Sequence, residues 1–580
     1  MKLSSGRRRQ IANAARNRRE IIAAQLSRRD MMRLGLLTAG GMLVAKGGLS
    51  ARAADLADTG GNPVSPPTTP FVVPLPIMPL AQSVAPKTLG PAPTIAPNVA
   101  GGEGRTRDHQ RFKEFAPKTY FETREREGQH SFHPDLPTQT IWGYNGIFPG
   151  PTYHAKTGTP CLVRLRNQLP PLNQPPVGGF GRADTICHLH NGHTPSESDG
   201  FPTDFFAPGQ FYDLHYPNIR AGNDERETMN TLWYHDHRLD FTSQNVYKGL
   251  AGFFLLFDEQ DTGNETEGGA AFGLPSGDCD VPMLFADKIF DEDGNAFFDL
   301  FNLDGIIGDK FTVNGAIQPF FQVHPRKYRL RWLNSGPSRF YELFLTDLDN
   351  PTQVLPFTQI SNDGNLLPAP VPVRSVRLSV AERCDVIVDF SQWKPGSRVY
   401  LENRLEQVNG RGPTDRIKPA GTGDLLLRFD VVLPKVKDAS RVPKAFRPLP
   451  TIDLNKVVQT RTWKFERRNG AWVINGNFFD LDQVRASPKQ GTSEIWVFQN
   501  ASAGWQHPIH VHFEEFQILS RNGQPPPPNE VARKDVVRLG FNEEIRVLFK
   551  FRDFLGRYPM HCHNVVHEDH AMMLRFDIVP

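Results

Sequence analysis

The C-terminal stretch Met560-His561-Cys562-His563-Asn564-Val565-Val566-His567-Glu568-Asp569-His570-Ala571-Met572-Met573 places four histidines and a cysteine within fourteen residues. In an extended strand, side chains alternate between the two faces, so His561 and His563 point one way and Cys562 the other. The two histidines then lie roughly 6.5 Å apart, a spacing that suits two neighbouring metal ions. On the opposite face, Cys562 is placed to share a metal with His567, one further histidine and a weakly bound Met572.

This ligand set predicts copper. Two imidazoles, a thiolate and a distant thioether form the trigonal site of blue-copper proteins, whereas Mg²⁺ and Ca²⁺ prefer oxygen ligands. A lone buried cysteine or histidine is usually structural, but that explanation does not account for so dense a cluster. The motif also requires partner ligands elsewhere in the chain.

Three further histidine motifs supply such partners. They are Cys187-His188-Leu189-His190-Asn191-Gly192-His193, Trp233-Tyr234-His235-Asp236-His237 and His507-Pro508-Ile509-His510-Val511-His512. Each contains a His-x-His pair, which places both imidazoles on one face of a strand. With the C-terminal pair they provide eight imidazoles, enough for three copper ions with open positions for oxygen, beside a fourth ion at the cysteine. One pair alone would be weak evidence, but four pairs together with the cysteine motif are strong.

The rest of the chain predicts a large all-β protein. Its 580 residues suffice for three or four domains, and 49 Gly and 50 Pro are natural for a chain with many turns. Apolar and charged residues alternate in short runs such as 161–166 and 328–332, as in β-sandwiches or barrels. Residues 55–100 form a Pro-rich arm or linker. The blocks that follow are expected to be domains at 101–260, 275–435 and 450–580.

The charge and the motifs of residues 1–54 indicate an export signal. They carry 12 Lys or Arg and two acidic residues, so the remainder of the chain, whose total charge is +3, carries −7. A mildly acidic body argues against a nucleic-acid partner. Ser27-Arg28-Arg29-Asp30-Met31-Met32 precedes an apolar run at 34–45 and an Ala51-Arg52-Ala53 cleavage pattern. The run is too short to span a bilayer. A basic arm that binds acidic partners is the alternative.

Four cysteines remain if Cys562 binds a metal. In an exported protein they allow zero, one or two disulfides, and the sequence does not choose among the pairings. These are Cys161, Cys187, Cys279 and Cys384.

The four motifs resemble the copper-binding motifs of multicopper oxidases, the laccase family. The C-terminal motif is especially similar to those of bacterial spore-coat laccases and bilirubin oxidases. The similarity extends over roughly residues 110–580 and includes the segments 133–137, 142–152, 245–252, 328–334 and 381–390. It implies three cupredoxin-like Greek-key β-domains. The paired arginines of the leader resemble a bacterial twin-arginine signal, which implies a periplasmic or secreted protein.

The resemblance also implies the ligands of four copper ions. The type 1 copper takes His507, Cys562 and His567, with Met572 as the axial ligand, and the type 2 copper takes His188 and His510. The type 3 pair takes His190, His235, His237, His512, His561 and His563. The middle block contains only His324 and is expected to bind no copper, so the cluster must form between the first and third domains. One departure from the family is Asn191, where a Gly is usual, so the loop over the type 2 copper is expected to differ.

The implied reaction is the one-electron oxidation of phenolic or aromatic substrates, coupled to the four-electron reduction of dioxygen to water. Electrons are expected to enter at an exposed edge of His567 and to pass through Cys562 to His561 and His563. Glu568 and Asp199 are candidates for proton delivery. For both carboxylates the alternative is a surface or turn residue. For Asp199 this alternative is supported by the Gly200 that follows it, because Asp-Gly is a common turn signal.

Three other functions stay open. They are oxidation of Mn²⁺, Fe²⁺ or Cu⁺, a bilirubin oxidase-like activity, and copper binding without catalysis. The chain has no Met between Met283 and Met560, unlike cuprous oxidases of the family, which have a Met-rich segment near the type 1 site. Its complete ligand set argues against a non-catalytic protein. The expected partners are a small-molecule or metal-ion reductant and O₂, with no nucleic acid and no membrane span, and the protein is expected to be a monomer.

Overall fold

The computed structural model describes residues 63–300, 302–468 and 470–580, so the predicted export signal lies outside the described residues. The prediction of an all-β fold is confirmed: in the described part, six β-sheets form three pairs, and the α-helices are only α3 (Thr242–Lys248) and α4 (Val565–Asp569). We call the segments that supply each pair of sheets the first unit (119–257), the middle unit (280–431) and the third unit (457–578). Each lies within a predicted block, and the domain boundaries themselves stay a prediction.

The first unit has two four-stranded sheets. One contains, in spatial order, β2 (Gln139–Tyr144), β1 (Thr119–His130), β4 (Cys161–Asn167) and β6 (Phe211–Tyr216). The other contains β3 (Tyr153–Lys156), β8 (Ala251–Phe257), β7 (Thr231–Asp236) and β5 (Cys187–His190). Apolar side chains from the facing sides of the two sheets, among them Phe121, Val163, Leu189 and Phe254, form the core between them.

The middle unit has a larger pair of sheets. The first is β12 (Ala316–Ile317), β11 (Lys310–Val313), β9 (Asp280–Phe290), β14 (Lys327–Asn334), β19 (Arg383–Asp389), β16 (Phe357–Asn362) and β17 (Asn365–Val373), with β10 (Ala296–Phe297) paired to β9. The second is β13 (Phe320–Val323), β21 (Asp424–Val431), β20 (Arg398–Asn403), β15 (Tyr341–Thr346) and β18 (Ser375–Leu378). Trp332 and Val386 from one sheet pack against Leu401 and Phe429 from the other.

The third unit repeats this plan. One sheet is β23 (Ala471–Ile474), β22 (Val457–Arg468), β25 (Ser493–Asn500), β30 (Glu544–Lys550), β27 (Phe516–Arg521) and β28 (Arg533–Lys534). The other is β24 (Val484–Ala486), β32 (Met573–Ile578), β31 (Gly556–Cys562), β26 (His507–Val511) and β29 (Val536–Leu539). The core between the sheets includes Trp496, Ile509, Cys562 and Met572.

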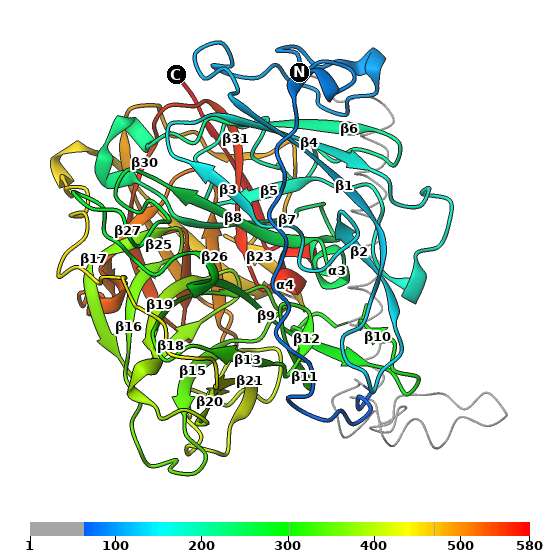
Figure 1. Ribbon diagram of the computed structural model, residues 1–580. Helices are drawn as coiled ribbons and strands as arrows, with labels where there is room; N and C mark the ends of the chain where they lie inside the picture. Colours follow the sequence, from blue (N-terminus) through cyan, green and yellow to red (C-terminus); the bar gives the residue numbers. More distant parts are fainter. Residues whose placement is uncertain (1–62, 301, 469) are drawn as a thin grey trace.

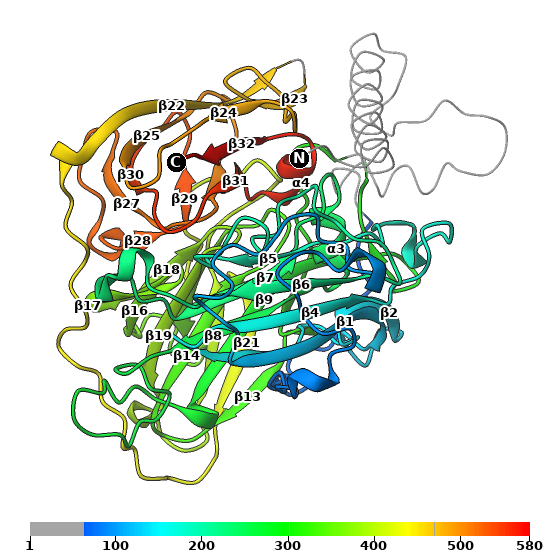
Figure 2. The ribbon, with the colours of Figure 1, turned by 90° about the horizontal axis from the view of Figure 1, so that it is seen from above.

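The three units meet in a shared apolar cluster. It contains Trp233 and Phe253 from the first unit, Leu284 and Leu333 from the middle unit, and Val536 from the third. Figure 2 shows the third unit, yellow to red, packed against the blue-to-green first unit. Burial at this junction keeps the units in a fixed relative position.

The Pro-rich arm is laid along the surface of two units. Its Phe71 and Leu75 amides donate to the carbonyl oxygens of Gln318 and Phe320 in the middle unit, at 2.8 and 2.7 Å. Further on, the amides of Ala81 and Val84 donate to carbonyl oxygens of the first unit, both at 2.8 Å. Figure 1 shows this arm as the dark-blue trace that crosses the molecule.

All five cysteines are buried free thiols, so the described structure contains no disulfide. Within residues 63–580, with 301 and 469 left out, no helix combines the length and apolar character needed to cross a bilayer.

A partly buried contact between His193 and Asp553 joins the first unit to the third. The Nε2 of His193 lies 2.8 Å from Asp553 Oδ2, which also accepts from the Gly222 amide at 2.6 Å. Burial by itself would raise the pKa of Asp553, but the hydrogen bond and charge of His193, the Gly222 amide and the charge of Arg111 together lower it to about 2.

We therefore expect this contact to lose its stabilising effect in acid. A carboxyl group whose pKa is lower in the folded than in the unfolded chain stabilises the fold above its unfolded pKa, and this contribution, about 2 kcal/mol, is lost as the pH falls from about 4 to about 2. Asp553→Asn in copper-free protein should lower Tm at pH 6, and the difference from the unsubstituted chain should shrink as the pH approaches 3. A difference in Tm that stays constant from pH 6 to pH 3 would contradict this assignment.

Candidate metal centre

The histidine motifs sit on strands that face each other across the first and third units. His188 and His190 belong to β5, and His188 pairs in register with His235 of β7. In the third unit, His510 of β26 pairs in register with His561 of β31. The second histidine of the other motifs lies just beyond the end of its strand. Because β5 and β7 face β26 and β31, residues more than 300 positions apart in the sequence come into contact.

The structure brings all eleven predicted histidine and cysteine ligands into compact buried groups, in each of which the potential ligand atoms lie within 4.8 Å of one another. The groups are His188, His190 and His510; His190, His235 and His563; His237, His512 and His561; and His507, Cys562 and His567. The predicted type 2 pair, His188 and His510, has its Nε2 atoms 3.4 Å apart. The six predicted type 3 histidines separate into two groups of three, as two adjacent ions require.

The imidazole nitrogens are arranged as metal ligands rather than as hydrogen-bond partners of one another. The Nε2 atom of His561 lies 3.2 Å from the Nε2 atoms of both His237 and His512. The Nε2 atoms of His190 and His235 are buried without any hydrogen-bond partner in the described structure. Burial, with the charges of neighbouring imidazoles and Arg383, lowers the pKa of His190, and burial lowers that of His235 to about 3, so the rings are neutral. Neutral, unpaired nitrogens directed at one point fit copper.

Hydrogen bonds behind the rings fix which nitrogen faces the centre. The Nδ1 atoms of His188 and His235 lie 2.5 and 2.7 Å from the carbonyl oxygens of Asp199 and Asp236. Donation of the Nδ1 proton to a carbonyl leaves Nε2 with its lone pair free for a metal. The arrangement is reversed at His507, whose Nε2 lies 2.8 Å from Ser502 Oγ and whose Nδ1 faces Cys562.

The cysteine group matches the predicted type 1 site. The Sγ of Cys562 lies 3.4 Å from His507 Nδ1 and 3.6 Å from His567 Nδ1. Met572 is fully buried in the same core, and its carbonyl oxygen accepts from the Cys562 amide at 3.0 Å. Burial raises the pKa of the Cys562 thiol well above its ordinary value, so a thiolate here requires a bound cation.

The expectation of an exposed edge on His567 is wrong. The ring is completely buried, and its Nε2 lies 3.1 Å from the carbonyl oxygen of Asp304 in the middle unit. Trp472 lies against the ring with centroids 3.9 Å apart. The sequence around His567 does not reveal that Asp304 covers the ring, because Asp304 lies 263 residues away in the chain. A role of His567 in electron uptake stays a prediction.

Both carboxylates suggested for proton delivery are buried against the histidines, and neither is a surface residue. The Oε2 of Glu568 lies 3.0 Å from His561 Nδ1, and its Oε1 lies 3.5 Å from His237 Nε2. Asp199 Oδ2 lies 2.8 Å from His512 Nδ1. Desolvation raises the pKa of Asp199 well above its ordinary value. Both carboxylates therefore contact ligand histidines directly, and their role in proton delivery stays a prediction.

The unusual Asn191 changes the contacts of the loop after β5. Its φ of 67° lies in the left-handed region, which Asn tolerates better than most residues. Its Nδ2 donates to Glu515 Oε1 of the third unit at 2.7 Å. Where a glycine would make no such contact, Asn191 adds a polar link between units next to His190.

Sequence reasoning missed several residues that touch the ligands, among them Asp535, Trp233 and Trp472. Asp535 contacts two ligand histidines, Trp233 stacks on His235 with centroids 4.3 Å apart, and Trp472 covers His567. Trp233 lies within a motif that had already been recognised, so its position two residues before His235 was a usable signal. Trp472 lies in β23 and Asp535 lies between β28 and β29, and neither carries such a signal in the sequence around it.

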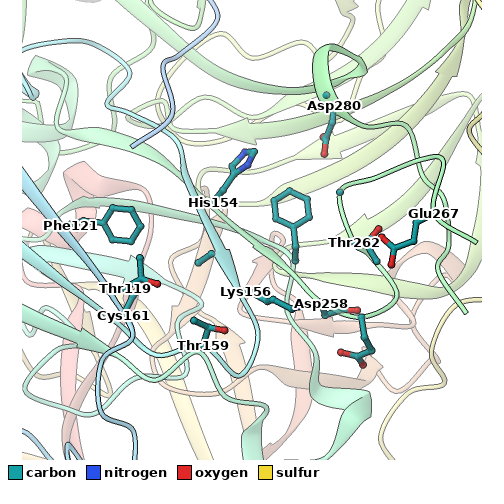
Figure 3. A pocket seen from close by; sticks show the side chains of 15 residues that line it. Thr119, Phe121, His154, Lys156, Thr159, Cys161, Asp258, Thr262, Glu267 and Asp280 are labelled. Atoms are coloured by element: carbon teal, nitrogen blue, oxygen red, sulfur yellow. The ribbon is translucent and has the colours of Figure 1, made fainter. Parts of the chain in front are cut away.

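A hollow of about 650 Å³ lies elsewhere, between β3 and the segment that joins the first and middle units. Figure 3 shows His154, Lys156, Asp258 and Asp280 around it. Its buried carboxylates are already paired, Asp258 with Arg447 and Asp280 with Arg331, both at 2.6 Å. No histidine of the metal centre lines it, and we assign it no ligand.

Comparison with known proteins agrees with this geometry. Family models described as multicopper oxidase match residues 127–261 and 448–580. The chain is 34% identical over 525 residues to a bilirubin oxidase of Albifimbria verrucaria, covering 89% of this chain and 82% of that protein. It is also 34% identical over 515 residues to a laccase of Bacillus subtilis, covering 80% of this chain and 94% of that protein.

Solved structures show the same fold. A laccase from Pediococcus acidilactici Pa5930 superposes with a TM-score of 0.70 at 25% identity, covering 91% of this chain and 97% of that one. A multicopper oxidase from Campylobacter jejuni described as a metallo-oxidase superposes with a TM-score of 0.68 at 20% identity, covering 89% and 98%. The cupredoxin-like architecture expected from the sequence is thereby confirmed.

We expect the copper-free protein to take up four copper ions and to gain stability as it does. An ion that binds the folded but not the unfolded chain at 1,000 times Kd adds about 4 kcal/mol. With an unfolding entropy of about 2.1 cal/mol/K per residue, each such ion should raise the Tm of a chain of this length by about 4 °C. Copper content and Tm measured during titration test this. His510→Ala should reduce the bound copper, whereas His324→Ala, which alters the histidine of the middle unit, should not. Equal uptake by both variants would contradict the ligand assignment.

Proposed function

Because the chain belongs to the multicopper oxidase family, we propose that it couples the one-electron oxidation of phenolic or aromatic compounds to the reduction of dioxygen to water. It is an oxidoreductase that uses oxygen, and copper is its cofactor. Copper ions held by the eleven histidine and cysteine groups would supply the redox chemistry. The chain's own residues bind and orient these ions, exclude water and exchange protons.

The observation that carries this proposal is the position of Cys562 between His561 and His563. Cys562 belongs to the group that it forms with His507 and His567, and its two neighbours belong to two different histidine groups. One short length of backbone at the end of β31 therefore joins a site suited to taking single electrons to a site suited to oxygen. Strand alternation makes this possible, because adjacent side chains serve opposite faces.

The surface above His567 supports an aromatic reductant. Trp505 is half-buried and lies edge-on to Trp472, with centroids 5.3 Å apart. Trp472 in turn lies against His567. A flat aromatic molecule stacked on Trp505 would be close to the proposed type 1 ligands without touching them. We propose that electrons reach His567 across the rings of Trp505 and Trp472.

A bilirubin-like substrate is the second candidate. The guanidinium of Arg411 lies 4.6 Å from the Trp505 ring centroid, and its side chain is about half exposed. Its Nε also lies 3.5 Å from Asp304 Oδ2, so a substrate carboxylate would share this cation with Asp304. An exposed cation beside an aromatic platform would favour aromatic reductants that carry a carboxylate, as bilirubin does. The similarity to a bilirubin oxidase supports the same choice.

We further propose that the protein is exported by the twin-arginine route and acts in the periplasm or outside the cell. The paired Arg28 and Arg29, the apolar run at 34–45 and the Ala51-Arg52-Ala53 pattern support this. A folded, metal-loaded cargo suits such a route.

Oxygen uptake is expected from the copper-loaded protein with phenols, and Cys562→Ser should abolish both that uptake and the blue colour. Without the sulfur ligand, the type 1 site loses its strongest bond to the metal, whereas the histidine groups remain. Oxygen uptake and copper content of both proteins test this, and the variant should keep about three copper ions. Substantial oxygen uptake by Cys562→Ser would rule out the proposed electron path.

Comparison of phenols, bilirubin, Mn²⁺, Fe²⁺ and Cu⁺ as reductants identifies the substrate class, and turnover with a metal ion alone would favour a metallo-oxidase.

Glu568→Gln is expected to slow oxygen reduction by about 10²-fold or more, because an amide of the same size cannot carry the proton that a carboxyl group transfers. Reduction of the type 1 site under anaerobic conditions should be unaffected, and bleaching of the blue colour measures it. Asp569→Asn serves as the control, because the neighbouring Asp569 accepts from the Ser243 amide at 3.0 Å rather than from a ligand histidine. Equal rates of oxygen consumption in both variants would argue against proton delivery by Glu568.

A further inference from the structure

We propose that the middle unit, which supplies none of the eleven ligand groups, positions two copper ligands from the other units through the pair Arg383–Asp535. Arg383 begins β19 of the middle unit, and Asp535 lies between β28 and β29 of the third unit. The inference rests on the proposed function, because it concerns the ligands His190 and His510. It makes Arg383 and Asp535 positioning residues rather than metal ligands.

Asp535 contacts one ligand histidine with its side chain and another with its backbone. Its Oδ2 lies 3.1 Å from His190 Nδ1, and its carbonyl oxygen lies 2.8 Å from His510 Nδ1. His190 comes from the first unit and His510 from the third. In both rings, an acceptor at Nδ1 leaves Nε2 directed at the metal centre. At His190 the acceptor Asp535 Oδ2 is the nearer neighbour of Nδ1, and Arg383 Nη1 lies 3.3 Å from the same atom. A single residue therefore sets the ring orientation of two ligands that approach the cluster from opposite sides.

Arg383 holds the Asp535 carboxylate by both oxygens. Its Nη1 donates to Oδ1 at 2.8 Å and its Nη2 donates to Oδ2 at 2.9 Å. Both side chains are almost fully buried. A bidentate guanidinium–carboxylate pair fixes the plane of the carboxylate as well as its distance, which a single lysine ammonium cannot do. The orientation of Oδ2 toward His190 thus depends on the guanidinium.

The backbone of Asp535 is held by the same unit. Asp363, in the turn between β16 and β17, accepts from the amides of Asp535 and Val536 with its Oδ2, at 3.1 and 3.2 Å. The Nζ of Lys534 lies 3.1 Å from Asp363 Oδ2 and 3.0 Å from Glu382 Oε1. The carbonyl that orients His510 therefore has little freedom to move relative to the middle unit.

The same turn also approaches the loop that follows His190. Gly364 has no room for a side chain, because an added Cβ would lie 1.6 Å from the Nδ2 of Asn191. The Gly364 carbonyl accepts from the Asn230 amide of the first unit at 2.7 Å. The turn is thus inserted between the first and third units, where it contacts the sequence on both sides of the cluster.

A second buried arginine of the middle unit provides a matched comparison. Arg329 pairs with Asp385 and Asp261 at 2.6 and 2.8 Å and is as buried as Arg383, but its hydrogen bonds reach no ligand histidine. If Arg383 only stabilised the fold, loss of either guanidinium would have the same kind of effect. If Arg383 positions ligands, only its loss should affect the copper cluster.

The experiment compares Arg383→Lys with Arg329→Lys in the full-length, copper-loaded protein. Lysine keeps the charge and removes the bidentate contact. We expect Arg383→Lys to keep the blue type 1 absorbance but to bind the other copper ions about 10- to 100-fold more weakly, the loss usual when the partner of a ligand histidine is removed. Copper content at limiting free copper, electron paramagnetic resonance of the type 2 copper and near-ultraviolet absorbance of the type 3 pair report this loss. Arg329→Lys should retain four copper ions at the same free copper.

Two results would overturn the proposal. One is an Arg383→Lys protein with four copper ions, unchanged type 2 and type 3 spectra and unchanged oxygen uptake. The other is an equal loss of copper in both variants, in proportion to their loss of Tm, which would show a purely structural role. If Arg383→Lys is not recovered folded, Asp535→Asn provides the same reading, because it keeps the size of the side chain and removes the charged bidentate pair. Unsubstituted protein with fewer than four copper ions would instead count against the proposed function.

Discussion

The structure depends on bringing neutral imidazoles from distant parts of the chain to one buried place. Eight histidines from β5, β7, β26, β31 and the residues that follow these strands face one another where the first and third units meet. Burial lowers the pKa of rings such as His188, His510 and His563, and without an ion their lone pairs face one another without compensation. Metal binding and the assembly of the units are therefore coupled, because neither unit alone holds the complete set of ligands. Other features near the centre, including the charged network behind it, hold the units in this arrangement.

Much of the fold and of the ligand set could be predicted from the sequence because both depend on local patterns. The period-two alternation in 328–332 predicted β14, and the tripeptide His561-Cys562-His563 predicted ligands on two faces of β31. The pattern at β14 was nevertheless incomplete: Arg329 and Arg331 are as buried as the apolar residues between which they lie. Their burial is possible because nearby carboxylates neutralise their charge: Asp385 of β19 and Asp280 of β9 in the same sheet, and Asp261 from the segment after β8.

What could not be predicted from the sequence are contacts between units. Nothing in the sequence around Asp304 indicates that its carbonyl oxygen covers His567, and the resemblance to known oxidases had suggested an exposed ring. Asp535 lies in the short break between β28 and β29 and gains its importance only from the approach of Arg383, 152 residues away. Such buried charged pairs add little net stability over well-packed apolar residues, but they permit only one arrangement of their partners. At a site that needs fixed ligand directions, this restriction is their main contribution.

The Pro-rich arm has a consequence for the behaviour of the protein at high concentration. β13 is the outer strand of its sheet, and the arm pairs with it at Phe320. β3 is likewise an outer strand, and the arm pairs beside it at Thr152. Unpaired outer strands attract strands of other chains, and proline-containing covers are one natural protection against this. The arm therefore keeps neighbouring copies of the protein from joining edge to edge, so a shortened chain that begins after it would be prone to aggregate even with every copper ligand in place.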